Sequence, residues 1–118
     1  MKIVINVKDN KFLLDKSVVG SEKTFIRFLI DDVSMFHDDI VDWFFEPEKH
    51  YSAGEFFYEE QIGNNVIIYP DYYDGPSFTI SKNNFLKVIN KWHEIMQKKP
   101  KKITITQEGD DFFFDVEY

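Results

Sequence analysis

The stretch between Ser81 and Pro100 constrains the fold more than any other part of the chain. Ser81 is a residue type that caps helix N-termini, and Pro100 cannot continue a helix. Between them the apolar residues recur at helical spacing, and the centre of the stripe is formed by Phe85, Ile89, Trp92 and Met96. We therefore expect an amphipathic helix from Lys82 to about Lys98 that buries this stripe against the rest of the domain.

Short β-strand patterns lie on both sides of this helix. A β-branched run at residues 2–7 and a short run at 77–80 each favour a strand. Two further pairs of runs are joined by turn residues and predict β-hairpins: 55–62 with 66–69, and 103–107 with 111–117.

The segment 24–30 is ambiguous. Ile26, Phe28 and Ile30 alternate along it, which favours a strand. A helix is the alternative, because Phe25, Phe28 and Leu29 also match helical spacing. We expect a strand here.

A second helix is predicted from Ser34, as N-cap, to the residues before Pro47. Its apolar face is formed by Phe36, Ile40, Trp43 and Phe44. Strands, helix, hairpin, strand, helix and hairpin follow one another along the 118 residues. This order predicts a single α+β domain over residues 1–118, in which two helices pack on one mainly antiparallel sheet.

Charge is distributed very unevenly along the chain. Residues 31–74 hold twelve carboxylates and one lysine, whereas residues 82–102 hold seven lysines and one glutamate. Like charges held close together on a folded surface repel one another, so an acidic region of this kind suggests a basic partner. Aromatic residues in the same region could supply buried contacts. The candidate partner-binding residues are Asp38, Asp39, Asp42, Glu46, Glu59, Glu60, Asp71, Tyr72, Tyr73 and Asp74.

No pattern typical of catalysis is present. The chain lacks cysteine, and its five glycines are scattered at turn-like positions instead of forming a phosphate-binding loop. The three histidines, His37, His50 and His93, have no metal-ligand spacing. Adjacent helical residues such as His37 and Asp38 point about 100° apart, which argues against a shared ion. We expect no catalytic residue, no cofactor and no metal ion.

Composition also bears on location and on partners. The absence of cysteine fits a reducing compartment. The apolar run near the N-terminus is too short for a signal peptide, and no run is long enough to cross a membrane. A net charge of −7 with a single arginine does not suit direct binding of nucleic acid. We expect a cytoplasmic protein that binds neither membranes nor nucleic acid directly.

One segment has a family resemblance. Residues Ser81–Gln107 (SKNNFLKVINKWHEIMQKKPKKITITQ) combine a capped helix, a Phe-Leu-x-x-Ile-x-x-Trp stripe, a Lys-Pro pair and a short strand. This resembles the C-terminal part of immunity proteins from bacterial polymorphic and contact-dependent growth inhibition toxin systems. The resemblance covers about a quarter of the chain. It implies a small acidic cytoplasmic inhibitor that covers the active site of a basic nuclease toxin, and it assigns no individual residues.

The leading hypothesis is therefore a non-enzymatic immunity protein that binds and neutralises a basic nuclease toxin through its acidic, aromatic-rich surface. The first alternative is a nucleic-acid mimic directed at a DNA-binding protein, which would use the same carboxylates. A small metal-dependent hydrolase that uses the clustered carboxylates is a second alternative. A third is an acidic homodimer whose aromatic residues pair with one another.

Overall fold

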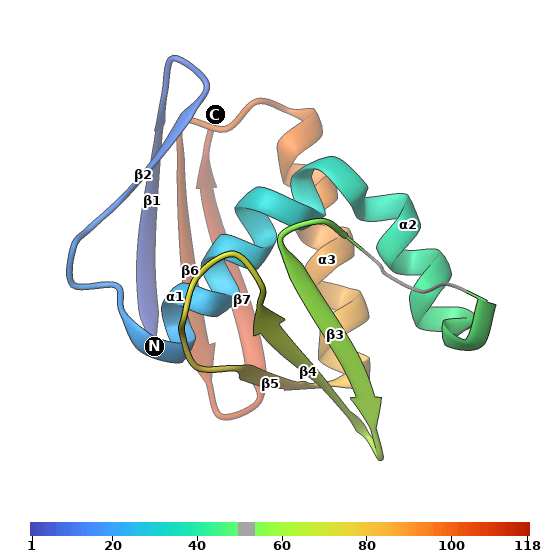
Figure 1. The fold of residues 1–118 in the computed structure, drawn as a ribbon. Helices are drawn as coiled ribbons and strands as arrows, with labels where there is room; N and C mark the ends of the chain where they lie inside the picture. The colour runs from blue at the N-terminus through green and yellow to red at the C-terminus, as the bar shows by residue number, and fades with distance from the viewer. Residues whose placement is uncertain (50–53) are drawn as a thin grey trace.

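The computed structural model describes residues 1–49 and 54–118, and its fold is drawn in Figure 1. Two antiparallel sheets are present. The four-stranded sheet has the order β2-β1-β6-β7 and is built from β1 (Lys2–Lys8), β2 (Lys11–Leu14), β6 (Lys102–Glu108) and β7 (Asp111–Glu117). The three-stranded sheet has the order β3-β4-β5 and is built from β3 (Phe57–Ile62), β4 (Asn65–Pro70) and β5 (Phe78–Ser81).

The helices lie in two separate segments of the chain. A continuous helical path begins with α1 (Gly20–Arg27), passes through the π-helical segment η1 (Phe28–Val33) and ends with α2 (Ser34–Phe45). A short 3₁₀ turn, η2 (Pro47–Lys49), follows it. The second helical segment is α3 (Lys82–Gln97), the longest single helix among the described residues. Among the described residues, no helix is both long and apolar enough to cross a membrane.

The predicted α+β class, the antiparallel pairing and the helix after Ser81 are confirmed. The Ser81 side chain accepts a hydrogen bond from the backbone N–H of Asn84 at 3.2 Å, which caps α3 as expected. Both predicted hairpins are present, with Tyr58 paired to Tyr69 in one and Thr104 paired to Asp115 in the other. The strands form two sheets, however, instead of the one that we expected.

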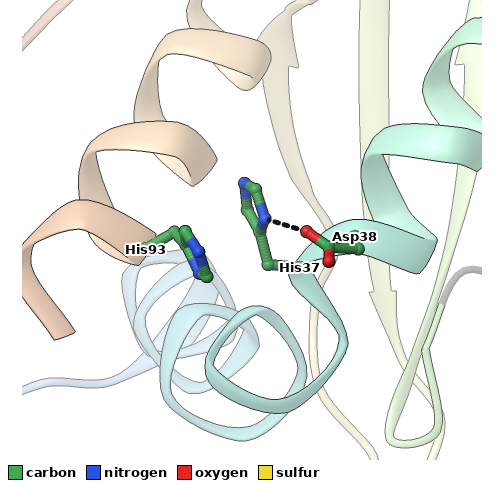
Figure 2. A group of neighbouring side chains, drawn as sticks. All are labelled: His37, Asp38 and His93. Atoms are coloured by element: carbon green, nitrogen blue, oxygen red, sulfur yellow. Dashed lines mark hydrogen bonds and ion pairs between the residues drawn. The ribbon is translucent and has the colours of Figure 1, made fainter. Parts of the chain in front are cut away.

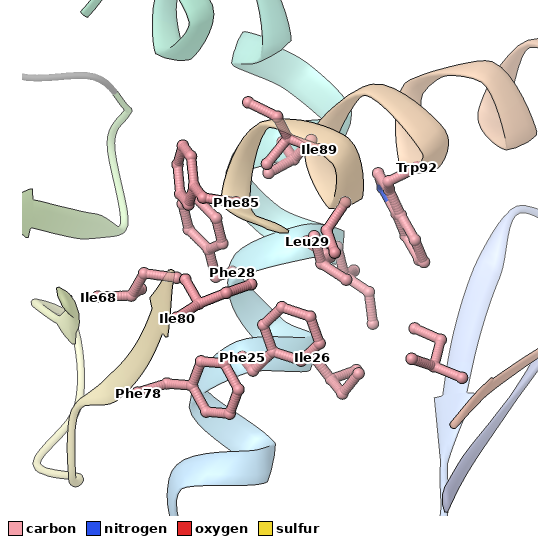
Figure 3. Packing of buried hydrophobic residues seen from close by; sticks show 14 of the residues in the cluster. Phe25, Ile26, Phe28, Leu29, Ile68, Phe78, Ile80, Phe85, Ile89 and Trp92 are labelled. Carbon is pink, nitrogen blue, oxygen red and sulfur yellow. The ribbon is translucent and has the colours of Figure 1, made fainter. Parts of the chain in front are cut away.

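The strand prediction for residues 24–30 is wrong, because these residues belong to α1 and η1. The reason lies in the burial of this helix. Figure 3 shows α1 passing between the three-stranded sheet and strand β1 of the four-stranded sheet. Phe25, for example, stacks on Phe78 of β5 at 4.5 Å and lies 5.2 Å from Phe112 of β7. All of residues 24–30 except Arg27 are buried. A helical segment covered on several sides is apolar on nearly every face, so its 3.6-residue period does not appear in the sequence.

Two smaller predictions also need correction. Ser34 does not cap α2, because the helix continues without a break from η1; its hydroxyl donates instead to the Leu29 carbonyl at 3.1 Å. Strand β2 was not predicted at all. It returns from β1 through Asp9 and Asn10, whose φ angles of 52° and 62° suit a tight two-residue hairpin turn.

The core lies where the helices meet both sheets. Trp92 of α3 is fully buried, and its indole N–H donates to the Ser34 hydroxyl at 2.9 Å. Phe28 of η1 contacts Phe57 of β3 and Phe85 of α3, with ring centroids 5.8 and 6.0 Å apart. These contacts fix η1 and α3 relative to each other, and they position α2, which continues directly from η1.

Candidate functional site

The outer face of α2 carries four of the predicted partner-binding residues on the surface. Asp38, Asp39, Asp42 and Glu46 are all exposed, and Asp38 has 93% of its side-chain surface accessible. On the inner face, Ile40 and Trp43 are buried, as the apolar spacing predicted. Asp39 and Asp42 form no ion pair with any residue that the structure describes, so their charges face solvent.

Large apolar side chains are exposed at both ends of this acidic face. Met35 lies at its start with 70% of its surface accessible, and Phe45 lies at its end with 64% accessible. Phe45 packs edge-on against Phe44, with ring centroids 5.3 Å apart. Glu46, next to Phe45, forms an ion pair with Lys49. The face therefore combines carboxylates with apolar groups that could be buried by a partner.

A second group of predicted residues lies in the loop that joins β4 to β5. Asp71, Tyr72 and Asp74 are exposed there, whereas Tyr73 is half-buried. The Tyr72 hydroxyl donates to the Asp31 carboxylate at 2.8 Å, so the loop is attached to η1. This group lies on a different element from the α2 face, and no local sequence pattern indicates the polar contact that holds the loop.

Glu60 is also exposed, on the outer side of β3, whereas its neighbour Glu59 is half-buried. Both carboxylate oxygens of Glu59 are buried and lack a hydrogen-bond partner among the described residues. Its side chain shares the inner side of β3 with Phe57 and Gln61. Glu59 was predicted as a partner-binding residue because of its charge; strand alternation turns its carboxylate toward the inner side of β3, away from the exposed Glu60.

The Glu59 carboxyl has an unusual electrostatic environment. Burial, together with the nearby Asp32 carboxylate, raises the pKa of Glu59 well above its ordinary value. Asp32 is fully buried, and it accepts hydrogen bonds from the backbone N–H groups of Glu55, Phe56 and Phe57 at 3.0–3.3 Å. Burial raises the pKa of Asp32, and these three donors oppose that rise. Asp32 thus attaches η1 to the start of β3.

Two histidines and one aspartate meet where α2 passes α3 (Figure 2). His37 Nδ1 lies 2.9 Å from an Asp38 carboxylate oxygen, and His37 Nε2 lies 2.8 Å from the Asn90 side-chain oxygen. The His37 ring stacks on the His93 ring with centroids 4.0 Å apart and planes 10° apart. One ligand-type atom from each of His37, Asp38 and His93 lies within 4.8 Å of the others.

This cluster contradicts the prediction, made from the spacing of the histidines along the chain, that no ligand-type side chains meet. The argument that His37 and Asp38 point too far apart to meet is wrong, because both side chains are long enough to turn toward each other. The third member, His93, is 56 positions away in sequence, so no local pattern could have joined it to them. His37 lies directly after a break in helical geometry at Phe36, whose φ and ψ are −126° and 27°. His50 lies outside the described residues.

Three cavities provide further context. One of about 430 Å³ lies between α3 and β7 and is lined by Val88, Phe112 and Lys91, among others. Another of about 530 Å³ lies beside Lys23 and Tyr73. A third, of about 320 Å³, is lined by His37, Asp38 and His93, among others.

Comparisons with known proteins give no family. No protein-family model, no curated protein and no solved structure matches the chain. Any functional conclusion therefore depends on the residues and their geometry.

Proposed function

We propose that this protein is a non-enzymatic inhibitor that captures a basic protein through the acidic face of α2, in the manner of an immunity protein acting on a basic nuclease toxin. The observation that carries the proposal is the composition of that face. Asp39 and Asp42 are exposed and form no ion pair within the described part of the chain, and Met35 and Phe45 are exposed beside them.

Electrostatics gives this face its first role. Exposed carboxylates with no nearby cation create a negative potential that accelerates the encounter with a positive surface. The lysines of α3 are on a different helix, and Lys91 is partly compensated by Glu94 at 3.7 Å. A basic partner would therefore be attracted to α2 and not to α3.

Apolar contact gives the face its second role. Charge pairs at the rim of an interface add little affinity, whereas buried aromatic and apolar anchors add much more. Phe45 is the best-placed anchor, because it is exposed at the end of the acidic face. In the proposed complex, the carboxylates bring the partner in and orient it, and Phe45 and Met35 are buried in the contact.

The test begins with recovery of the partner from the native host by a tagged wild-type protein, followed by association kinetics with the purified partner. Replacing Asp39 and Asp42 together with lysine should slow association at least tenfold at low salt and should remove most of its salt dependence. The matched control is Lys87→Glu with Lys91→Glu on α3, which should change the association rate less than twofold. These substitutions leave Asp38 unchanged.

Two results would contradict the proposal. One is a partner that binds the charge-reversed variant as fast as the wild type. The other is recovery of the protein alone as a tight dimer that is unaffected by the charge reversal, which would indicate self-association. A recovered partner that binds DNA, and whose DNA binding this protein blocks, would favour nucleic-acid mimicry over toxin inhibition.

A further inference from the structure

The hydrogen bonds of His37 determine which of its ring nitrogens can bind a cation. Asn90 presents its side-chain oxygen to His37 Nε2 at 2.8 Å, so Nε2 carries the proton and donates it. In a neutral imidazole the other nitrogen, Nδ1, then has a lone pair. That lone pair faces an Asp38 carboxylate oxygen at 2.9 Å. A proton on Nδ1, or a metal ion in its place, brings these two atoms together.

We propose that His37, Asp38 and His93 bind a divalent transition-metal ion of the zinc type, which links α2 to α3. Imidazole nitrogen and carboxylate oxygen are ordinary zinc ligands, with bond lengths of about 2.0–2.2 Å. Two such ligands on one tetrahedral ion are separated by roughly 3–3.5 Å. The 2.9 Å distance between His37 Nδ1 and the Asp38 oxygen is already close to this value.

Asn90 is placed to orient His37, as the hydrogen-bond partners of metal-binding histidines do. A metal-binding histidine usually donates its second N–H to an oxygen, which fixes the tautomer and the orientation of the ring. The hydrogen bond from His37 Nε2 to Asn90 does both. Asn90 and His93 are both on α3, so the helix that supplies the third ligand also orients the first.

His93 completes the set after a side-chain rotation. The two rings are nearly parallel, so their in-plane lone pairs cannot both point at one ion in this arrangement. The hydrogen bond that holds the His93 ring within the described chain is a long one of 3.5 Å to Gln97, so rotation costs little. The required movement is small, because the three ligand-type atoms already lie within 4.8 Å of one another.

The surroundings suit an ion of double positive charge. The adjoining pocket of about 320 Å³ is lined by all three proposed ligands and by Asp39, so it has room for a bound water molecule as the fourth ligand. No lysine or arginine lines this pocket. Mixed imidazole and carboxylate ligands favour zinc, nickel or copper over magnesium, which prefers oxygen ligands alone.

The experiment is a calorimetric titration of the chelator-treated protein with ZnCl₂ at pH 7.5, with MgCl₂ as the comparison ion. We expect one zinc ion per chain, bound at least tenfold more tightly than magnesium. His93→Gln and His37→Gln should each weaken zinc binding at least tenfold. Asp42→Asn is the matched control, because it removes one exposed charge from the same helix but no ligand, and it should change zinc affinity less than twofold. Circular dichroism checks that each variant is folded.

A second measurement on the wild type does not depend on any variant. Zinc should shift the ring ¹⁵N signals of His37 and His93 in the NMR spectrum, and an excess of EDTA should reverse these shifts. Absence of zinc binding, equal affinity for magnesium, unchanged binding by both histidine variants, or unshifted histidine signals would each overturn the proposal. Zinc binding does not depend on the proposed inhibitor function, so either proposal can fail alone.

Discussion

The helical path from Gly20 to Phe45 and the single helix α3 are built in different ways. α3 is regular, capped by Ser81, and amphipathic, with one buried face that includes Phe85, Ile89 and Trp92. The first path changes character along its length. α1 is exposed at its start and buried at Thr24, Phe25 and Ile26, η1 is buried at every residue except Asp31, and α2 buries only Ile40 and Trp43. α3 therefore mainly supports the core, whereas α2 is free to carry charged groups for another purpose.

Removal of the main core residue of α3 should have the largest effect. Trp92 is fully buried and links α3 to Ser34 through its indole N–H. Trp92→Ala should lower the free energy of unfolding by about 3–5 kcal/mol, as for other buried large aromatic residues. Lys91→Ala, on the exposed side of α3, should cost less than about 0.5 kcal/mol. Urea denaturation measures both; a Trp92→Ala variant with wild-type stability would show that α3 is not the core helix.

Substitution of Asp32 tests how the first helical path is attached to the three-stranded sheet. Asn in its place keeps the size but loses the charge and one of the two oxygens that accept the three backbone N–H groups. Asp32→Asn should therefore cost about 2–3 kcal/mol, as for hydrogen bonds to a charged group. Asp39→Asn is the exposed control and should cost under about 0.5 kcal/mol. If urea denaturation shows the same loss of stability for both variants, the contact between η1 and β3 does not stabilise the fold.

Glu59 provides a smaller effect, of opposite sign, that depends on pH. Because its pKa is raised in the folded protein, the folded state holds a proton that the unfolded state releases. Stability should therefore fall as the pH rises from the unfolded value, about 4.3, toward the folded one. Glu59→Gln removes this titration, so it should raise stability by about 1–2 kcal/mol at pH 8, with a smaller gain near pH 4.

The control for Glu59→Gln is Glu60→Gln, the same change on the exposed side of β3. Thermal unfolding followed from pH 4 to pH 8 compares the two variants with the wild type. A difference between Glu59→Gln and the wild type that stays constant over this range would show that Glu59 is not buried as a neutral acid.

The contrast between the helices also explains which parts of the fold could be predicted. α3 has one solvent face, so Trp92 and Lys91 fall on opposite sides of a clear period, and its boundaries follow from Ser81 and Pro100. The segment 24–30, which spans the end of α1 and the start of η1, has no such face, so alternating Ile26 and Phe28 resembled a strand. The hydrophobic period of a helix appears in the sequence only when one of its faces is exposed to solvent. When every face is covered, apolar residues occur at all positions and the period is lost.

The candidate site was predicted in part, for a related reason. Exposure of Asp38, Asp39 and Asp42 followed from the period of α2, whose inner face is apolar. The burial of the Glu59 carboxylate depends on which side of β3 faces the helices. Because Glu59 is a charged residue type, the sequence pattern predicted that it would be exposed. The approach of His93 to His37 depends on how two helices distant in sequence cross. Such contacts are set by tertiary packing and have no local pattern.

The position of α1 between the two sheets has a consequence for how the chain folds. Phe25 touches strands from both sheets, β5 on one side and β7 on the other. Neither sheet can separate without exposing this helix to water, so both should be lost in one cooperative transition. Amide hydrogens of the buried end of α1, Thr24 to Ile26, should then exchange only through global unfolding and be among the slowest in the molecule, whereas those of α2, near the surface, should exchange through local opening.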